Sequence, residues 1–275
     1  MAKDPKYSNK IPNAQGNISY DETEEITWRF LVTRQNRLIK NRACKEFLKG
    51  LELLDFAHKV PQLPEISSVL MAHTRWSVAP VPEIIPAEEF FTLLSNRKFP
   101  SANFLRVPEE VDYIKEPDIF HEIYGHCPLL TNQDYADYMQ EYAKLALTVK
   151  GKERMRLFRL FWFTIEFGLL KENGNYRAYG GGILSSSKET VWSVDDATPE
   201  RVPLDPLSAL RTPYRIDILQ PIYFVVNSLQ ELFGVVKKDL ITMAKESLTM
   251  GDFPAKYPPN HSTQSGVATT NQGLY

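Results

Sequence analysis

The hydrophobic and polar positions between residues 21 and 250 mostly follow the spacing of helices. Residues 21–56 contain no proline and mix charged with apolar positions, which predicts a long helix. Asp21 with Glu24 three residues later is typical of the capping box that begins such a helix. Pro86 suits the first turn of another helix. Further helices are predicted over residues 63–74, 85–99, 117–126, 132–150, 152–174 and 221–246.

A different pattern appears at "YRAYGGGILSS" (176–186), where three glycines precede β-forming residues. It predicts a turn and a short strand, with 191–196 and 214–220 as its partners in a small sheet. Residues 1–20 are polar and predict an irregular arm, and residues 251–275 predict a loose or disordered tail. The fold class expected for residues 21–250 is therefore one mainly α domain of packed helices with a small β-sheet.

Composition narrows the classes of function. The hydrophobic fraction of 43%, the charged fraction of 24% and the net charge of -2 are those of a soluble globular protein. No basic patch indicates nucleic acid, and no apolar run approaches the roughly 20 residues that span a membrane. The N-terminus lacks the apolar core of a secretory signal. The two cysteines, Cys44 and Cys127, are far apart and read as free thiols, which predicts a cytoplasmic protein.

The stretch "EPDIFHEIYGHCPLL" contains two of the five histidines, His121 and His126. The zinc protease signature places two histidines four residues apart, whereas these are five apart. On a regular helix five steps of about 100° separate two side chains by roughly 140°. Both can reach one ion only if the helix ends or bends between them, and Gly125 is placed to permit that. The alternative is a pair of histidines on the surface of a helix.

A third metal ligand is needed, and Glu166 is the best candidate because it is the lone acid in residues 160–170. A buried, unpaired carboxylate costs several kcal/mol. A metal would compensate it, and so would an arginine; the pattern alone leaves both open, with three arginines within reach in sequence, Arg156, Arg159 and Arg177. With His121 and His126, Glu166 would form a set of two histidines and one carboxylate. Such a set suits non-haem Fe(II) with open positions for O2, and also catalytic zinc.

Three motifs, "EPDIFHEIYGHCPLL", "FWFTIEFGLL" and "RAYGGGILSSSKE", occur in this order and with these gaps. Together they resemble the pterin-dependent aromatic amino acid hydroxylases, and the resemblance covers about residues 20–245. It implies the fold of that family's catalytic domain, with Fe(II) and a tetrahydropterin as cofactors. The chain is most similar to the short bacterial members that convert phenylalanine to tyrosine. Tryptophan and tyrosine remain alternative substrates.

The resemblance also implies roles for individual residues. His121, His126 and Glu166 match the iron ligands. Four residues match the substrate site: Arg106 for the substrate carboxylate, Pro117 and Trp162 for the walls of the ring pocket, and Ser185, which orients the first histidine. A lone arginine in a loop is otherwise a surface ion pair, here with Glu109, Glu110 or Asp112.

Five residues match the pterin site. Phe90 matches the ring on which the pterin stacks, Glu83 and Ile85 belong to the backbone segment that hydrogen-bonds the pterin, and Glu122 lies near it. Phe161 stands where many members carry tyrosine, so a hydroxyl contact is lost. Ile114 likewise replaces a threonine of the animal enzymes beside the substrate carboxylate.

Two other classes fit the histidines. A zinc hydrolase would use the same three ligands with Glu122 as general base. A helical binding module would close a structural metal site with Cys127. The expected partners are small molecules, namely an aromatic amino acid, O2 and a tetrahydropterin, with no nucleic acid and no membrane. The protein is expected to be a monomer or a homodimer.

Overall fold

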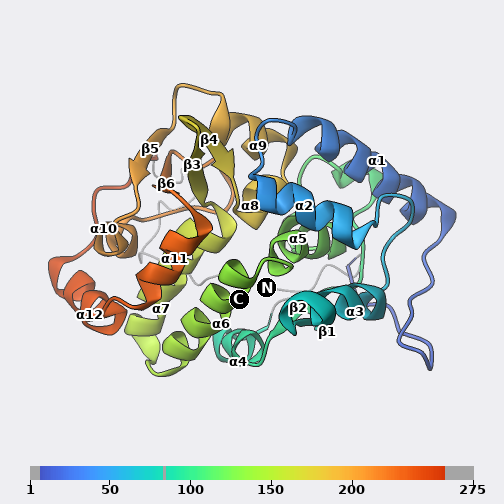
Figure 1. The fold of residues 1–275 in the computed structure, drawn as a ribbon, viewed down its shortest axis with the longest axis horizontal. Helices are drawn as coiled ribbons and strands as arrows, with labels where there is room; N and C mark the ends of the chain where they lie inside the picture. The colour runs from blue at the N-terminus through green and yellow to red at the C-terminus, as the bar shows by residue number, and fades with distance from the viewer. Residues whose placement is uncertain (1–6, 83–84, 258–275) are drawn as a thin grey trace, which may run out of the picture.

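Helices form most of the protein, in a computed structural model that describes residues 7–82 and 85–257. Figure 1 shows them packed around one another, with the strands gathered in two places. The α-helices are α1 (Glu22–Leu38), α2 (Lys45–Leu54), α3 (Leu63–Thr74), α4 (Ala87–Ser95), α5 (Cys127–Leu130), α6 (Gln133–Leu147), α7 (Gly151–Phe161), α8 (Gly181–Leu184), α9 (Ser187–Val194), α10 (Pro206–Arg211), α11 (Leu229–Val236) and α12 (Leu240–Met250). A 3-10 turn η1 (Pro108–Glu110) and two π-helices, η2 (Phe120–His126) and η3 (Trp162–Glu166), complete the helical elements of this part of the chain.

The capping box predicted at Asp21 and Glu24 is present at the start of α1. The single long helix predicted over residues 21–56 is wrong, because α1 and α2 are separated by six residues, 39–44. There the chain turns at Asn41, which has a φ of 61°. The Cys44 N–H then donates to the Ala178 carbonyl at 3.0 Å. The backbone groups of this segment are therefore satisfied by a strand residue instead of by a helical turn.

The helix predicted over residues 152–174 ends early. α7 continues into η3, which stops at Glu166, and β3 (Leu169–Glu172) follows. Asn173 and Gly174, with φ angles of 49° and 81°, join β3 to β4 (Asn175–Ala178). Asn-Gly between two short runs is a strong signal for a two-residue hairpin, and here it outweighs the helical composition.

The larger sheet has the order β4-β3-β6-β5, with β5 (Glu200–Pro203) and β6 (Ile222–Val226) parallel to their neighbours. The strand predicted within 176–186 is misplaced: β4 ends at Ala178, before the glycines, and the β-forming residues after them lie in α8. The other two predicted strands are wrong: residues 191–194 belong to α9 and residues 214–220 form an irregular loop. The helix predicted over 221–246 divides into β6, α11 and α12. β6 is a run of β-branched and aromatic residues paired on both sides, which is typical of a buried parallel strand.

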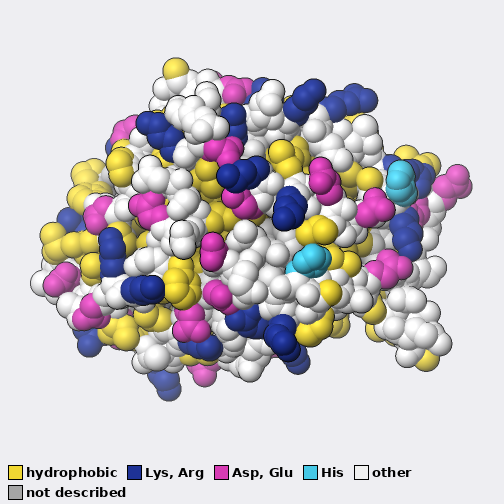
Figure 2. All heavy atoms as spheres, in the orientation of Figure 1, with side chains coloured by type: hydrophobic (Ala, Val, Ile, Leu, Met, Phe, Trp, Pro, Cys, Tyr) yellow, Lys and Arg dark blue, Asp and Glu magenta, His cyan; other side chains and the backbone are white. Residues whose placement is uncertain are grey.

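A second sheet consists of β1 (Ser77–Pro80) and β2 (Lys98–Ser101), which are parallel. In Figure 1 these two strands lie beside α3 and α4, while the larger sheet lies in the half that contains α10 to α12. Positive and negative side chains are interspersed over the face seen in Figure 2. None of the helices in the described ranges is long and apolar enough to cross a membrane.

Both terminal segments lie against the domain where they are described. Residues 7–20 are irregular. They are joined to the domain by the backbone N–H of Lys10, which donates to the side-chain oxygen of Asn103 at 2.7 Å. At the other end Phe253 donates its N–H to Arg211 at 2.9 Å, and Asp252 pairs with Arg159 at 3.0 Å. The remainder of the predicted arm and tail, 1–6 and 258–275, lies outside the described residues.

Candidate active site

The two histidines point the same way because their helix is a π-helix. η2 runs from Phe120 to His126, and its hydrogen bonds join residues five apart. Residues 121 and 126 therefore lie one above the other. The expectation that the helix ends or bends at Gly125 is wrong: the helix widens instead. Gly125 serves close packing, since a Cβ atom there would lie 2.8 Å from the Gly181 carbonyl oxygen.

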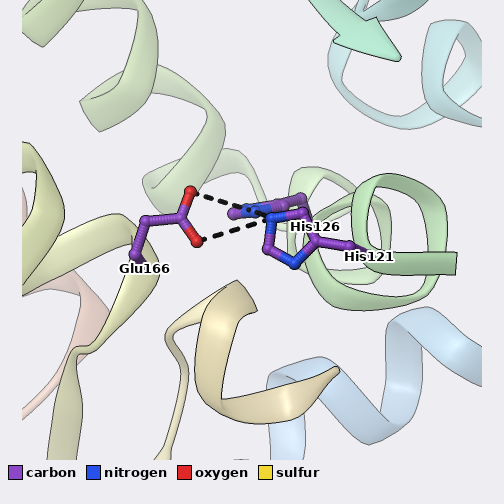
Figure 3. A group of neighbouring side chains, drawn as sticks. All are labelled: His121, His126 and Glu166. Carbon is purple, nitrogen blue, oxygen red and sulfur yellow. Dashed lines mark hydrogen bonds and ion pairs between the residues drawn. The ribbon is translucent and has the colours of Figure 1, made fainter. Parts of the chain in front are cut away.

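Glu166 faces both imidazoles from the end of the second π-helix, η3 (Figure 3). Its carboxylate oxygens lie 3.7 Å from His121 Nε2 and 3.3 Å from His126 Nε2. The two Nε2 atoms are 3.3 Å apart. Glu166 is only 3% exposed, and the arginines that could have paired with it are engaged elsewhere: Arg156 and Arg159 with Asp252, and Arg177 with Glu172.

The hydrogen bonds around Ser185 fix the tautomer of His121. The Ser185 hydroxyl donates to the Gly181 carbonyl at 2.9 Å, so its oxygen accepts from the His121 Nδ1–H, also at 2.9 Å. This leaves the lone pair of His121 on Nε2, which faces Glu166. Burial lowers the pKa of His121 to about 4. The imidazole is therefore neutral at pH 7, which is the form that binds a metal.

The three side chains fit a divalent metal ion. All three ligand atoms lie within 4.8 Å of one another. Separations of 3.3–3.7 Å are those of ligand atoms that share one ion with bonds of about 2.0–2.2 Å. A buried carboxylate such as that of Glu166 carries a negative charge that a metal cation would compensate. Two histidines and one carboxylate on one side suit non-haem Fe(II).

The glycines of "YGGGIL" make the close packing around this group possible. A Cβ atom on Gly181 would lie 2.3 Å from the His126 ring. A Cβ atom on Gly180 would lie 2.3 Å from the Glu166 carbonyl oxygen. Any larger residue at either position would displace a candidate ligand, which explains the glycine run that the sequence pattern had suggested was only a turn.

A cavity of about 500 Å³ opens beside the metal group. Its volume is in the range of small-molecule sites. The cavity brings together the four residues predicted to bind the substrate and two of the three candidate ligands: Arg106, Pro117, Trp162, Ser185, His121 and Glu166.

Arg106 is buried and is not a surface ion pair with Glu109, Glu110 or Asp112, the acids considered from the sequence. Its partner is Asp118, which accepts from Nε and Nη2 at 2.8 Å each. A guanidinium has five N–H groups, so three remain for other partners. Asp118 also accepts the backbone N–H of His121 at 3.0 Å. One buried carboxylate therefore positions both the arginine of the cavity and the helix that carries the histidines.

Trp162 is held between two other aromatic rings. Tyr214 stacks on it at 4.5 Å between ring centroids and 19° between planes, and Phe167 lies 4.6 Å away on a tilt of 32°. Trp162 is 8% exposed and lines the cavity. The indole therefore forms a fixed wall.

The residues predicted to bind the pterin lie in a different environment. Phe90 and Phe161 are in contact, with centroids 5.5 Å apart, inside a cluster of buried aromatic rings. Ile85 and Glu122 are also buried, and none of these four residues lines the 500 Å³ cavity. Burial raises the pKa of Glu122 well above its usual range. Glu83 lies outside the described residues.

Two residues of the site were missed in the sequence. Asp118 had a signal, since an acid three residues before His121 at a helix start is the spacing of a side chain that accepts a backbone N–H. Tyr214 had none, because its position beside Trp162 depends on a loop that follows α10.

Comparison with known proteins agrees with this geometry. The family model described as biopterin-dependent aromatic amino acid hydroxylase matches residues 1–267. The chain belongs to this family. Its fold is the one the resemblance implied, since the chain superimposes on a cold-active phenylalanine hydroxylase from Colwellia psychrerythraea with a TM-score of 0.88, at 45% identity over 91% of this chain and 97% of that one.

Two other relatives bear on the site. Phenylalanine-4-hydroxylase of Pseudomonas aeruginosa is 49% identical over 94% of this chain and 99% of its own length. A phenylalanine hydroxylase from Chromobacterium violaceum, solved with bound oxidised Fe(III), is 38% identical with a TM-score of 0.84 over 92% of each chain. Membership of this family accounts for the two histidines. The two alternatives considered from the sequence, a zinc hydrolase and a helical module with a structural metal, are therefore not needed.

Proposed function

We propose that this protein is a phenylalanine 4-monooxygenase that converts L-phenylalanine to L-tyrosine with O2, a tetrahydropterin and Fe(II). The observation that carries the proposal is one cavity that is lined both by His121 and Glu166 of the metal group and by Arg106 and Trp162. The family membership and the names of the relatives support it. Tryptophan or tyrosine hydroxylation is the alternative within the same family.

Iron and tetrahydropterin, when bound, would supply the electrons that activate O2, and O2 itself would supply the oxygen atom that enters the aromatic ring. His121, His126 and Glu166 would hold the iron. Ser185 keeps the His121 ring in the orientation that presents Nε2 to the metal.

The substrate would be held at both of its ends. The N–H groups of Arg106 that Asp118 does not use form a second fork, which matches a carboxylate. The ring would lie against Trp162 and Pro117, because both line the cavity and Trp162 is immobilised by its neighbours. Fixed placement of two reactants is a large part of catalysis in such sites.

The pterin would stack on Phe90 beside Phe161, near the Glu83 and Ile85 segment. Burial raises the pKa of Glu122 and so favours its protonated form, which can donate a hydrogen bond as well as accept one. Phe161 offers the pterin an apolar ring edge and no hydroxyl.

Replacing Phe90 by leucine tests the pterin role. Leucine keeps an apolar side chain in the aromatic cluster but removes the stacked ring, which is worth about 0.5–1.5 kcal/mol beyond buried area. We expect the Michaelis constant for tetrahydropterin to rise by about 2–12-fold and that for phenylalanine to change little. Phe91→Leu is the matched control, because Phe91 packs in the same cluster with centroids 5.5 Å from Phe90. Equal effects of Phe90→Leu on both constants would remove Phe90 from this role.

Substrate preference tests the proposed reaction itself. The iron-loaded protein is given tetrahydropterin, O2 and, separately, phenylalanine, tryptophan and tyrosine, and the hydroxylated products are quantified. We expect kcat/KM to be highest for phenylalanine, with tyrosine as its product. A higher kcat/KM for tryptophan or tyrosine would favour the alternative.

We also propose that the enzyme acts in the cytoplasm as a monomer or homodimer, on small molecules alone. Both cysteines, Cys44 and Cys127, are free and buried, which suits a reducing compartment. The net charge of -2, and the interspersed charges on the face seen in Figure 2, do not favour binding to nucleic acid.

A further inference from the structure

Four acidic residues line the cavity beside the metal group: Asp112, Glu166, Glu189 and Asp217. Two of them pair with an arginine, and a third belongs to the group that could bind a metal ion. Asp112 pairs with Arg34 at 2.5 Å, and Asp217 accepts from Arg215 at 2.9 and 2.5 Å. Glu166 belongs to the metal group. Glu189 is the exception, because no lysine or arginine of residues 7–82 and 85–257 lies within ion-pair distance of it.

Glu189 is anchored through one oxygen only. Its Oε1 accepts the backbone N–H of Gln220 at 3.0 Å and the hydroxyl of Tyr223. Its Oε2 receives no hydrogen bond from the described part of the chain. Glu189 is 4% exposed, yet it lines the cavity. The carboxylate is therefore fixed in position by α9 and by residues 220–223, with one oxygen left for a ligand.

A carboxylate in this position lacks a compensating charge. An ionised group that leaves water without a cation loses several kcal/mol of hydration free energy. Burial accordingly raises the pKa of Glu189 to about 7. A cation that bound beside Oε2 would lower that pKa again and keep the group charged.

We propose that Glu189 binds the ammonium group of the amino-acid substrate through Oε2, while Arg106 binds the substrate carboxylate. The assignment rests on the proposed function, since it takes an α-amino acid as the ligand of this cavity. Among the charged residues that line the cavity, Arg106 would then face the carboxylate of the zwitterion and Glu189 its ammonium group. Glu189 would select amino acids over aromatic carboxylic acids that lack the amino group.

A purely structural role for Glu189 makes a different prediction. Through Gln220 and Tyr223 it joins α9 to the start of β6, so its removal could loosen the loop that lines the cavity. Such loosening would weaken all ligands of the cavity alike. The ammonium contact, in contrast, affects only ligands that carry an ammonium group.

The test compares L-phenylalanine with 3-phenylpropanoate, which has the same ring and carboxylate but no amino group. Binding of each to the iron-loaded protein is measured by calorimetry, in the wild type and in Glu189→Gln. Glutamine still accepts from Gln220 and Tyr223 through its amide oxygen. We expect Glu189→Gln to weaken phenylalanine by about 10–100-fold and 3-phenylpropanoate by less than about twofold. Equal weakening of the two ligands, or unchanged affinity for phenylalanine, would overturn the assignment.

Two further measurements keep the result interpretable. Tyr223→Phe removes one anchor of Glu189 but keeps its carboxylate and the bond from the Gln220 N–H, so it should weaken phenylalanine less than Glu189→Gln does. A loss as large as that of Glu189→Gln would overturn the assignment. In the wild type alone, phenylalanine should bind at least about tenfold more tightly than 3-phenylpropanoate, and similar affinities would also overturn the assignment. If the wild type forms no tyrosine, the proposed function fails; if it forms tyrosine while Glu189→Gln binds phenylalanine normally, only the role of Glu189 fails.

Discussion

Replacing His121, His126 or Glu166 by alanine is expected to abolish iron binding and tyrosine formation while the helical circular dichroism stays close to that of the wild type. Each variant removes one of three atoms that converge within 4.8 Å. Residues that only orient a ligand usually cost about 10–100-fold in metal affinity or activity when removed, and ligands cost more. Iron content by metal analysis and tyrosine yield are measured on the same samples.

The matched control is His73→Ala, because His73 is an exposed histidine on α3, outside the metal group. It should keep the iron content and the turnover of the wild type. If one of the three alanine variants also keeps the iron content and the turnover of the wild type, the residue replaced in it is not a metal ligand. Ser185→Ala should fall between the two, because the His121 ring loses its hydrogen bond but keeps its Nε2.

Arg106→Lys is expected to raise the Michaelis constant for phenylalanine by about 10–150-fold, which corresponds to the 1.5–3 kcal/mol of a charged hydrogen bond. A guanidinium can donate two hydrogen bonds to Asp118 and two more to a substrate carboxylate. The ammonium of lysine is a point charge and cannot make both pairs. A poorly held ring should also lower the ratio of tyrosine formed to tetrahydropterin consumed. Iron content should change little, because Arg106 does not belong to the metal group.

Arg154→Lys separates loss of substrate binding from loss of a buried arginine. Arg154 is 8% exposed and donates to the Val149 carbonyl at 2.9 Å and to Glu88 at 3.0 Å, but it does not line the cavity. Both variants should lower the melting temperature, since each leaves buried acceptors unsatisfied. Only Arg106→Lys should weaken phenylalanine; if its affinity and coupling stay those of the wild type, Arg106 holds Asp118 and nothing else.

The sequence was sufficient to identify the three candidate metal ligands, but not the type of helix that places them side by side. The resemblance named His121, His126 and Glu166, and the structure has them in one group. The five-residue spacing pointed to a bend because a regular α-helix has 3.6 residues per turn. A π-helix is rare, and this one packs closely against Gly181, some sixty residues away, which no local pattern reveals.

The strands of the larger sheet also depend on contacts that are distant in the sequence. Residues 222–226 and 191–194 are both short and apolar, and only their surroundings make the first a strand and the second a helix. β6 lies between β3 and β5, which satisfies its backbone on both sides. Residues 191–194 follow Ser186, whose side chain accepts the Glu189 N–H and so begins α9. Pairing across some fifty residues cannot be read from either run alone.

The most direct test of the account is the balance between tyrosine formed and tetrahydropterin consumed by the wild-type protein loaded with Fe(II), in the presence of phenylalanine and O2. The account predicts that tyrosine appears in about equal amount to the tetrahydropterin consumed, and that it disappears when either iron or tetrahydropterin is left out. Absence of tyrosine, or tyrosine formation that continues without iron or without tetrahydropterin, would contradict it.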